Sequence, residues 1–323
     1  MPIPKKLIAV FALLGAVGFT QRVSTQAPPA GQPAASNAEL GTLHVAGNVY
    51  LLVGAGGNIG VQTGDEGVLV ADTGLAQNSE KVLAAIKKLS DKPIRWVLNT
   101  HFHPDHTGGN EAIAKAGSKT NGGPAEILSH ENVLTRMSAP ARKIATAAWP
   151  TDTYFPEEKD IYFNGEAVML YHDQAAHTDG DSIIFFRKSD VVMAGDIFVT
   201  TSYPFIDQAS GGSIQGELNA LNRILDIAVP AHEQEGGTFI IPGHGRVCDE
   251  ADVLEYRDMV TIIRDRIQDM VKRGMTIEQV KAAKPTLDYD RHYGSDTGFV
   301  TTAGFIEAVY KDLSKPQGKP IVR

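Results

Sequence analysis

Cysteine is almost absent from this sequence. Cys248 is the single cysteine among 323 residues, so the chain forms no internal disulfide bond. Its stability must therefore come from an apolar core and from any metal that it binds. Cys248 itself is expected to be a small buried residue. No short unit repeats along the chain, which excludes a solenoid.

Positive charge is also scarce. The sequence contains 30 Lys and Arg residues against 38 Asp and Glu residues, which gives a net charge of −8. An acidic surface repels polyanions, so we expect a small-molecule substrate and no nucleic-acid partner. Apolar residues make up 42% of the chain and charged residues 21%, values typical of a folded globular protein.

Long apolar runs are missing except near the amino terminus. Residues 7–19 carry no charge and follow Lys5 and Lys6, which is the pattern of a secretory signal peptide. The run is short for a bilayer span, and an uncleaved anchor or a buried helix is the alternative. We expect a signal peptide over residues 1–22 and a flexible linker over residues 23–39. The protein would then be periplasmic or secreted, with no stable membrane insertion after cleavage and a net charge of about −11.

Residues 40–250 alternate between strand and helix patterns. Glycine turns separate short apolar runs up to residue 74, and helical spacing follows. Later apolar runs occupy residues 93–100, 125–130, 167–172, 182–188, 191–196 and 238–243. Two successive sets of strands, each followed by helices, predict two sheets packed face to face with helices outside.

Residues 251–323 have a helical pattern. Apolar residues recur at three- and four-residue steps until Gly274 ends the first helix, and two shorter helical stretches follow at 276–283 and 300–313. We expect a C-terminal helical extension that packs on the core. A dimerisation surface is the alternative, and the oligomeric state stays open.

The stretch "NTHFHPDHTGGN", residues 99–110, concentrates candidate metal ligands. Four of them lie within six positions: His101, His103, Asp105 and His106. They directly follow an apolar strand, so they occupy the loop where that strand ends. Imidazole and carboxylate groups are typical ligands of zinc and similar cations. Six residues cannot surround two metals, so further ligands are expected at other strand ends.

Three later segments supply them. His177 lies in "HTDGD" after an apolar run, Asp196 follows Gly195, and His244 lies between two glycines in "PGHG". Glycine lets the backbone turn sharply and approach a metal closely. Taken alone, each residue is also compatible with an ordinary hydrogen-bonded loop. The remaining histidines lack ligand-rich neighbours and are not expected to bind metal: His44, His130, His172, His232 and His292.

The order "HFHPDH", "HTDGD", "GD" and "PGHG" resembles the metallo-β-lactamase-fold hydrolase superfamily over roughly residues 40 to 250. The resemblance implies an αββα sandwich with two metal ions, most simply Zn²⁺, at one edge. The implied ligands are His101, His103 and His177 for the first metal, Asp105, His106 and His244 for the second, and Asp196 as the bridge. A hydroxide between the metals would attack a carbonyl group, and Asp105 would be required for catalysis.

The resemblance also implies supporting residues. Asp72 matches an aspartate that orients a metal-binding histidine, although a turn aspartate before Gly74 explains it equally well. Thr178, with Asp181 and Asn110, is a weaker candidate for the same role of supporting a metal-binding residue. Gly212 and Ser213 could offer backbone N–H groups to an oxyanion, or could simply begin a helix. Arg246 could hold a substrate carboxylate, or could be an ordinary surface charge.

Departures within the family narrow the chemistry. Histidine at position 103 favours zinc hydrolysis over the iron-based redox branch, which usually has glutamate there. The bridging Asp196 resembles glyoxalase-type thioesterases, lactonases and some exported β-lactamase-like enzymes, while Val199 stands where the lactonases have tyrosine. We therefore predict an exported dinuclear zinc hydrolase that acts on a β-lactam, lactone or thioester. The alternatives are a mononuclear iron sulfur dioxygenase of the persulfide-oxidising type and a non-catalytic metal-binding protein.

Overall fold

A computed structural model of the chain describes residues 39–315. The expected signal peptide and nearly all of the expected linker lie outside these residues. None of the helices within them is both long enough and apolar enough to cross a membrane.

The amino-terminal half builds a seven-stranded sheet in which the strands follow their order along the chain. Its strands are β1 (Gly41–Ala46), β2 (Val49–Val53), β3 (Ile59–Gly64), β4 (Gly67–Ala71), β5 (Ile94–Leu98), β6 (Glu126–His130) and β7 (Asp152–Tyr154). The first four strands pair antiparallel because short glycine turns connect them. Strands β4 to β7 pair parallel, so their carboxyl ends meet at one edge.

Helices cover the outer face of this sheet and lie at its edge. They are α1 (Ser79–Leu89), α2 (Pro104–Thr107), α3 (Asn110–Ala116) and α4 (Glu131–Ser138), with the short 3-10 helices η1 (Ala76–Asn78), η2 (Pro140–Arg142) and η3 (Thr146–Ala148). Val82 and Ile86 of α1 and Ile113 of α3 are buried in a cluster with the outer side chains of β3 to β5. This face explains the helical spacing of apolar residues in α1.

The second sheet has five strands in the order β12, β11, β10, β9, β8. Its strands are β8 (Glu158–Phe163), β9 (Glu166–Asp173), β10 (Asp181–Phe186), β11 (Val191–Val199) and β12 (Phe239–His244). A buried cluster joins the inner faces of the two sheets, with Leu69 and Leu98 from one and Leu170 and Ile241 from the other. Only β11 and β12 pair parallel in this sheet, because a helix connects them.

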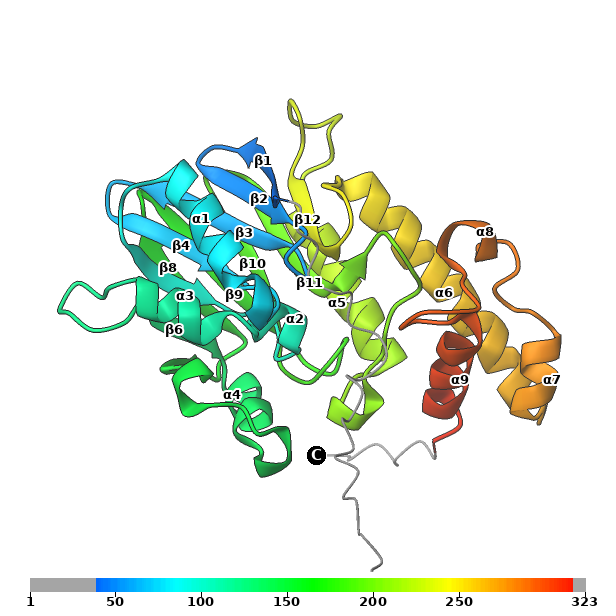
Figure 1. Ribbon diagram of the computed structural model, residues 1–323. Helices are drawn as coiled ribbons and strands as arrows, with labels where there is room; N and C mark the ends of the chain where they lie inside the picture. Colours follow the sequence, from blue (N-terminus) through cyan, green and yellow to red (C-terminus); the bar gives the residue numbers. More distant parts are fainter. Residues whose placement is uncertain (1–38, 316–323) are drawn as a thin grey trace, which may run out of the picture. The chain divides into compact units, whose positions relative to one another are not determined.

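Helices also cover the outer face of the second sheet, which completes the expected αββα sandwich (Figure 1). They are η4 (Gln208–Ser210), α5 (Ile214–Ile227), α6 (Glu250–Lys272), α7 (Ile277–Ala282), α8 (Asp290–Tyr293) and α9 (Thr302–Leu313). Asp249 and Asp252 form a capping box that begins α6. Buried side chains such as Ile263 of α6 and Phe305 of α9 share one cluster with α5 and β11. Cys248 is buried, as expected.

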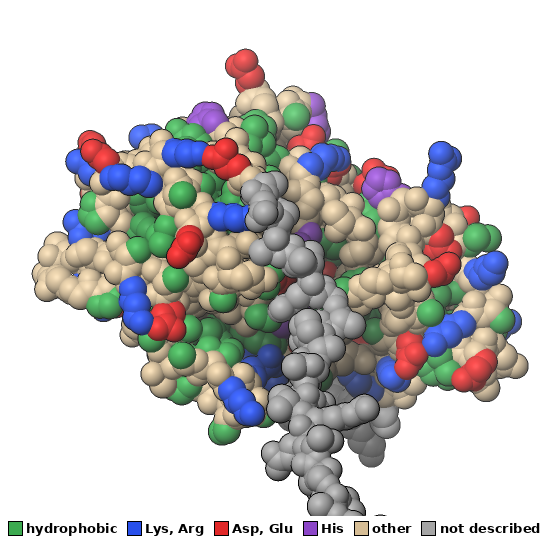
Figure 2. Space-filling model, in the orientation of Figure 1, with side chains coloured by type: hydrophobic (Ala, Val, Ile, Leu, Met, Phe, Trp, Pro, Cys, Tyr) green, Lys and Arg blue, Asp and Glu red, His purple; other side chains and the backbone are tan. Residues whose placement is uncertain are grey.

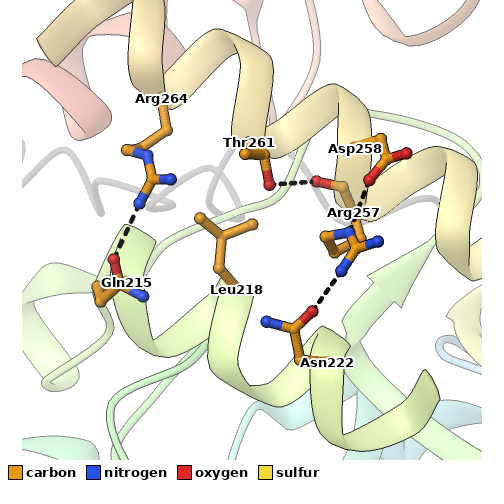
Figure 3. Close-up of a pocket in the computed structure, with 7 residues that line it drawn as sticks. All are labelled: Gln215, Leu218, Asn222, Arg257, Asp258, Thr261 and Arg264. Carbon is orange, nitrogen blue, oxygen red and sulfur yellow. Dashed lines mark hydrogen bonds and ion pairs between the residues drawn. The ribbon is translucent and has the colours of Figure 1, made fainter. Parts of the chain in front are cut away.

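A pocket of about 280 Å³ lies between side chains of α5 and α6 (Figure 3). Arg257 bonds to Asn222 across it at 2.6 Å, and Arg264 bonds to Gln215 at 2.9 Å. Leu218 lies between these two bridges. Each arginine of α6 thus donates to a side-chain amide of α5, and these two hydrogen bonds help to hold the helices together.

Candidate metal centre

All seven residues that the sequence nominates as metal ligands lie at one edge of the sandwich. His101, His103, His177 and Asp196 each offer one ligand atom to a first cluster, and Asp105, His106 and His244 do so in a second. Within each cluster these atoms lie within 4.8 Å of one another. The carboxyl ends of β5, β11 and β12 bring most of them to this edge.

In the first cluster, three imidazole nitrogens converge. His103 Nδ1 lies 3.1 Å from His101 Nε2 and 2.9 Å from His177 Nε2. Burial lowers the pKa of His101 well below its usual value, and the neighbouring imidazoles lower it further. Burial likewise lowers the pKa of His177 to about 4, against the opposing charge of Asp196. Both rings are therefore neutral at pH 7, which is the form that binds metal.

The second cluster contains acidic oxygens as well as imidazoles. His244 Nε2 lies 3.2 Å from Asp105 Oδ2 and 3.4 Å from Asp196 Oδ1, and His106 Nε2 lies 3.1 Å from the same Asp196 oxygen. Burial raises the pKa of Asp196, but the adjacent His106 and His244 outweigh burial and hold that pKa well below its usual range. Asp196 is therefore a carboxylate.

Two buried atoms where the clusters meet form no hydrogen bond of acceptable geometry within the described residues. His106 Nε2 and Asp196 Oδ1 are both buried and face each other at 3.1 Å. A buried polar atom without a partner costs about 1–3 kcal/mol, and a charged one costs more. Nitrogen and oxygen donors on both sides of this gap fit a zinc-like cation, which would satisfy both atoms.

Asp72 fixes the orientation of His106. Its Oδ2 accepts a hydrogen bond from His106 Nδ1 at 2.8 Å, and its carboxylate also accepts from the Thr100 backbone N–H and hydroxyl. The remaining His106 nitrogen, Nε2, then points into the second cluster. Asp72 has a positive φ of 61°, a strained conformation that such buried hydrogen bonds can maintain.

Thr178 and Asn110 act further from the clusters. The Thr178 backbone N–H and hydroxyl both donate to Asp181, at 2.7 Å and 2.5 Å, which closes the turn after His177. Asn110 bonds to Asn99 and supports the loop that follows β5. In the hydrogen bonds described for residues 39–315, neither Thr178 nor Asn110 contacts a candidate ligand.

Two outer contacts of the first cluster were not predicted from the sequence. His177 Nδ1 donates to the Phe205 carbonyl at 2.5 Å, and His103 Nε2 donates to Asp207 Oδ2 at 3.2 Å. Each contact turns the opposite ring nitrogen toward the other imidazoles. Asp207 lies 104 residues from His103 and stands in no ligand-like motif, so no local pattern marks it.

The three candidate substrate-binding residues are engaged elsewhere in the structure. The Gly212 N–H donates to the Asp207 carbonyl, and the Ser213 N–H donates to the carbonyls of residues 175 and 176. The Ser213 hydroxyl caps α5, so the helix-entry alternative describes both residues. Arg246 is exposed and forms a bidentate pair with Asp252, as a surface charge does.

Comparisons with known proteins agree with this geometry. The family model of the metallo-beta-lactamase superfamily matches residues 46–244, more than half of the chain. A linear primary-alkylsulfatase from Pseudomonas sp. is 26% identical over 305 residues, covering 79% of this chain and 56% of the relative. A hydroxyacylglutathione hydrolase from Rhodospirillum rubrum is 29% identical over 175 residues, covering 54% of this chain and 56% of the relative. The chain thus spans about half the length of the curated relatives it matches.

Solved structures share the fold. A stereoselective inverting sec-alkylsulfatase from Pseudomonas sp. aligns with a TM-score of 0.66 at 16% identity, covering 87% of this chain and 51% of that chain. A metallo-beta-lactamase from Pontibacter korlensis aligns with a TM-score of 0.55, also at 16% identity, covering 69% of this chain and 99% of that chain.

The Asp207 contact generates a prediction. Asp207→Asn keeps an acceptor oxygen but removes the charge that faces His103, so metal affinity should fall about tenfold, the lower end for loss of such a partner. Competition with a chromogenic chelator measures the affinity without reference to turnover. Asp226→Asn, at an exposed position of α5, is the matched control. Unchanged chelator competition in both Asp207→Asn and Asp207→Ala would show that the contact has no effect on the metal.

Proposed function

Because the chain belongs to the metallo-beta-lactamase superfamily, we propose that it is a metal-dependent hydrolase that uses about two zinc ions on a small carbonyl substrate. The observation that carries the proposal is the position of Asp196. Its Oδ1 lies within 3.4 Å of both His106 Nε2 and His244 Nε2, and its Oδ2 lies 3.8 Å from His177 Nε2. One carboxylate thus faces ligand atoms of both clusters.

The proposed ligand sets follow the two clusters. His101, His103 and His177 would bind one zinc, Asp105, His106 and His244 the other, with Asp196 between them. When bound, the two metals would supply a hydroxide at neutral pH and polarise the scissile carbonyl. Burial keeps His101 and His177 in the neutral form that binds zinc. Burial lowers the pKa values of His106 and His244, but the carboxylate of Asp196 outweighs burial, holding the pKa of His106 well above its usual value and that of His244 at about 9, so each of these rings would lose a proton when zinc binds.

Asp105 is the proposed catalytic residue of this chain. Its side chain is 33% exposed, against 14% for Asp196, so it is the carboxylate that an entering substrate meets. Burial raises its pKa, but His106 and His244 outweigh burial and hold the pKa below its usual value. An ionised carboxylate here can orient the attacking water and accept its proton.

The bond that is hydrolysed is a separate question. The similarity to a hydroxyacylglutathione hydrolase supports a thioester, and β-lactams and lactones share the same carbonyl chemistry. A sulfate ester is a second candidate, because the alkylsulfatase similarity extends over 79% of the chain and an alkylsulfatase also aligns in structure. A panel containing a chromogenic β-lactam, a lactone, a glutathione thioester and an alkyl sulfate distinguishes these substrates by kcat/KM.

Metal analysis tests the proposed chemistry. Purified protein should contain about two zinc ions per chain, and Asp105→Asn should lower turnover at least about 100-fold while circular dichroism stays unchanged. Asp226→Asn serves as the control for loss of a carboxylate. A metal-free chain with undiminished activity would contradict the proposal. A single iron per chain would instead favour the sulfur dioxygenase, and full metal loading without turnover on any substrate would favour a non-catalytic metal-binding protein.

We also propose that the protein is exported, with residues 1–22 as its signal peptide. Lys5 and Lys6 before an uncharged run support this role. The acidic composition supports a small-molecule substrate rather than nucleic acid as the partner.

Export has its own test. The full-length chain expressed in a Gram-negative bacterium should be recovered from the periplasm or the medium, shortened at its amino terminus as shown by mass spectrometry. Replacing both Lys5 and Lys6 with Glu should leave the unprocessed chain inside the cell, because the signal needs a positive amino-terminal region. Full-length protein in the cytoplasm of the unaltered strain would contradict the proposal.

A further inference from the structure

Two phenylalanines stand beside the first cluster. The ring of Phe205, in the segment between β11 and α5, is centred 5.7 Å from the His177 ring and 6.0 Å from the His103 ring. Phe299, in the segment between α8 and α9, packs on Phe205 at a centroid distance of 4.6 Å and an angle of 60°. An aromatic wall, defined here as Phe205 and Phe299, therefore flanks the imidazoles.

Phe299 is held in an exposed position. It is 73% exposed, although a phenylalanine gains stability when it is removed from water. The segment that carries it is ordered, because Ser295 and Thr302 exchange two hydrogen bonds that close the loop. Gly298, with φ +96°, supplies the turn just before Phe299. Because Phe299 packs on Phe205, the two rings form one contiguous apolar surface, and such a surface beside polar groups is typical of a ligand site.

The position of Phe205 is fixed by its neighbours in the same segment. Tyr203 is fully buried, stacks on Phe305 of α9 at 4.8 Å and donates its hydroxyl to Asp290. Gln208 donates to the Ala308 carbonyl of α9 at 3.1 Å. The Phe205 carbonyl itself accepts from His177. The segment of Phe205 is therefore bonded to an imidazole of the first cluster on one side and to the C-terminal helices on the other.

We propose that the aromatic wall binds the apolar part of the substrate, so that the enzyme prefers molecules with an alkyl or aryl group next to the bond that is hydrolysed. The inference rests on the proposed function for the nature of that bond, and it applies equally to a carbonyl and to a sulfate ester. The wall lies within one small-molecule length of the candidate ligands, which is why we assign it to the substrate and not to a second copy of the chain.

Binding of straight-chain carboxylates tests the wall without turnover. Acetate, butyrate, hexanoate and octanoate resemble hydrolysis products and differ only in apolar length. A fully buried methylene adds about fourfold in affinity (about 0.8 kcal/mol), so a wall that covers one side should add about twofold per methylene. Calorimetry on the protein as purified with its metal should show this increase from acetate to octanoate.

Variants assign the effect to Phe299. Phe299→Ala should weaken octanoate binding about tenfold and leave acetate binding unchanged, because acetate is too short to reach the wall. Phe299→Leu should retain most of the octanoate affinity. Tyr162→Ala is the matched control, since Tyr162 is an aromatic residue that is 81% exposed. It lies at the end of β8 and pairs with the start of β9, whereas His177 follows the other end of β9.

The outcomes separate the subsite from the hydrolase. Equal chain-length dependence in the unaltered protein and in Phe299→Ala would overturn the subsite, whatever the protein hydrolyses. A dimer in sedimentation that Phe299→Ala dissociates, with no change in octanoate affinity, would overturn it in favour of a contact between copies. Failure of turnover across the substrate panel would contradict the proposed hydrolase while leaving the binding result intact.

Discussion

The carboxylate of Asp196 and the imidazoles around it must be held close together, and the surrounding structure supplies the contacts that hold them. Three imidazole nitrogens lie about 3 Å apart in the first cluster, where lone pairs or protons repel one another. Where the two clusters meet, His106 Nε2 and Asp196 Oδ1 are buried 3.1 Å apart and form no hydrogen bond of acceptable geometry within the described residues. Such groups stay together only if packing holds them or a cation binds them. Metal binding would then stabilise the folded chain, because the unfolded chain has no such site.

Backbone packing supplies part of that restraint. A Cβ on Gly243 would collide with Asp196 Oδ1, and a Cβ on Gly57 would collide with the His106 ring. The main chain thus lies directly against two candidate ligands, and only a residue without a Cβ allows this close approach. Two pairs of parallel strands, β4 with β5 and β11 with β12, direct their carboxyl ends to the same edge. The sandwich brings the two halves of the centre together from segments about 90 to 140 residues apart in the chain.

Local patterns account for what the sequence predicted. His101 and His106 lie in one short motif after an apolar strand, and the αββα layering follows from alternating strand and helix patterns. Tertiary contacts account for what it did not predict. Nothing near Asp207 indicates a partner at His103, because the two meet only through folding. The Gly212–Ser213 sequence is compatible with an oxyanion site and with the start of a helix. In the structure the Ser213 N–H donates to the carbonyls of residues 175 and 176, so it is not free for an oxyanion.

The carboxyl-terminal helices and the candidate centre are mechanically linked. The superfamily match ends at His244, the last candidate ligand, so α6 to α9 lie beyond it. Yet Tyr203 stacks on Phe305, and the Ile214 N–H that begins α5 donates to Asp312 at 2.9 Å. These contacts hold the segment whose Phe205 carbonyl orients His177. The candidate ligands and the segment of Phe205 thus lie within the superfamily match, while the helices that hold this segment in place lie beyond it. Changes in those helices can therefore shift the surroundings of the site without replacing a candidate ligand.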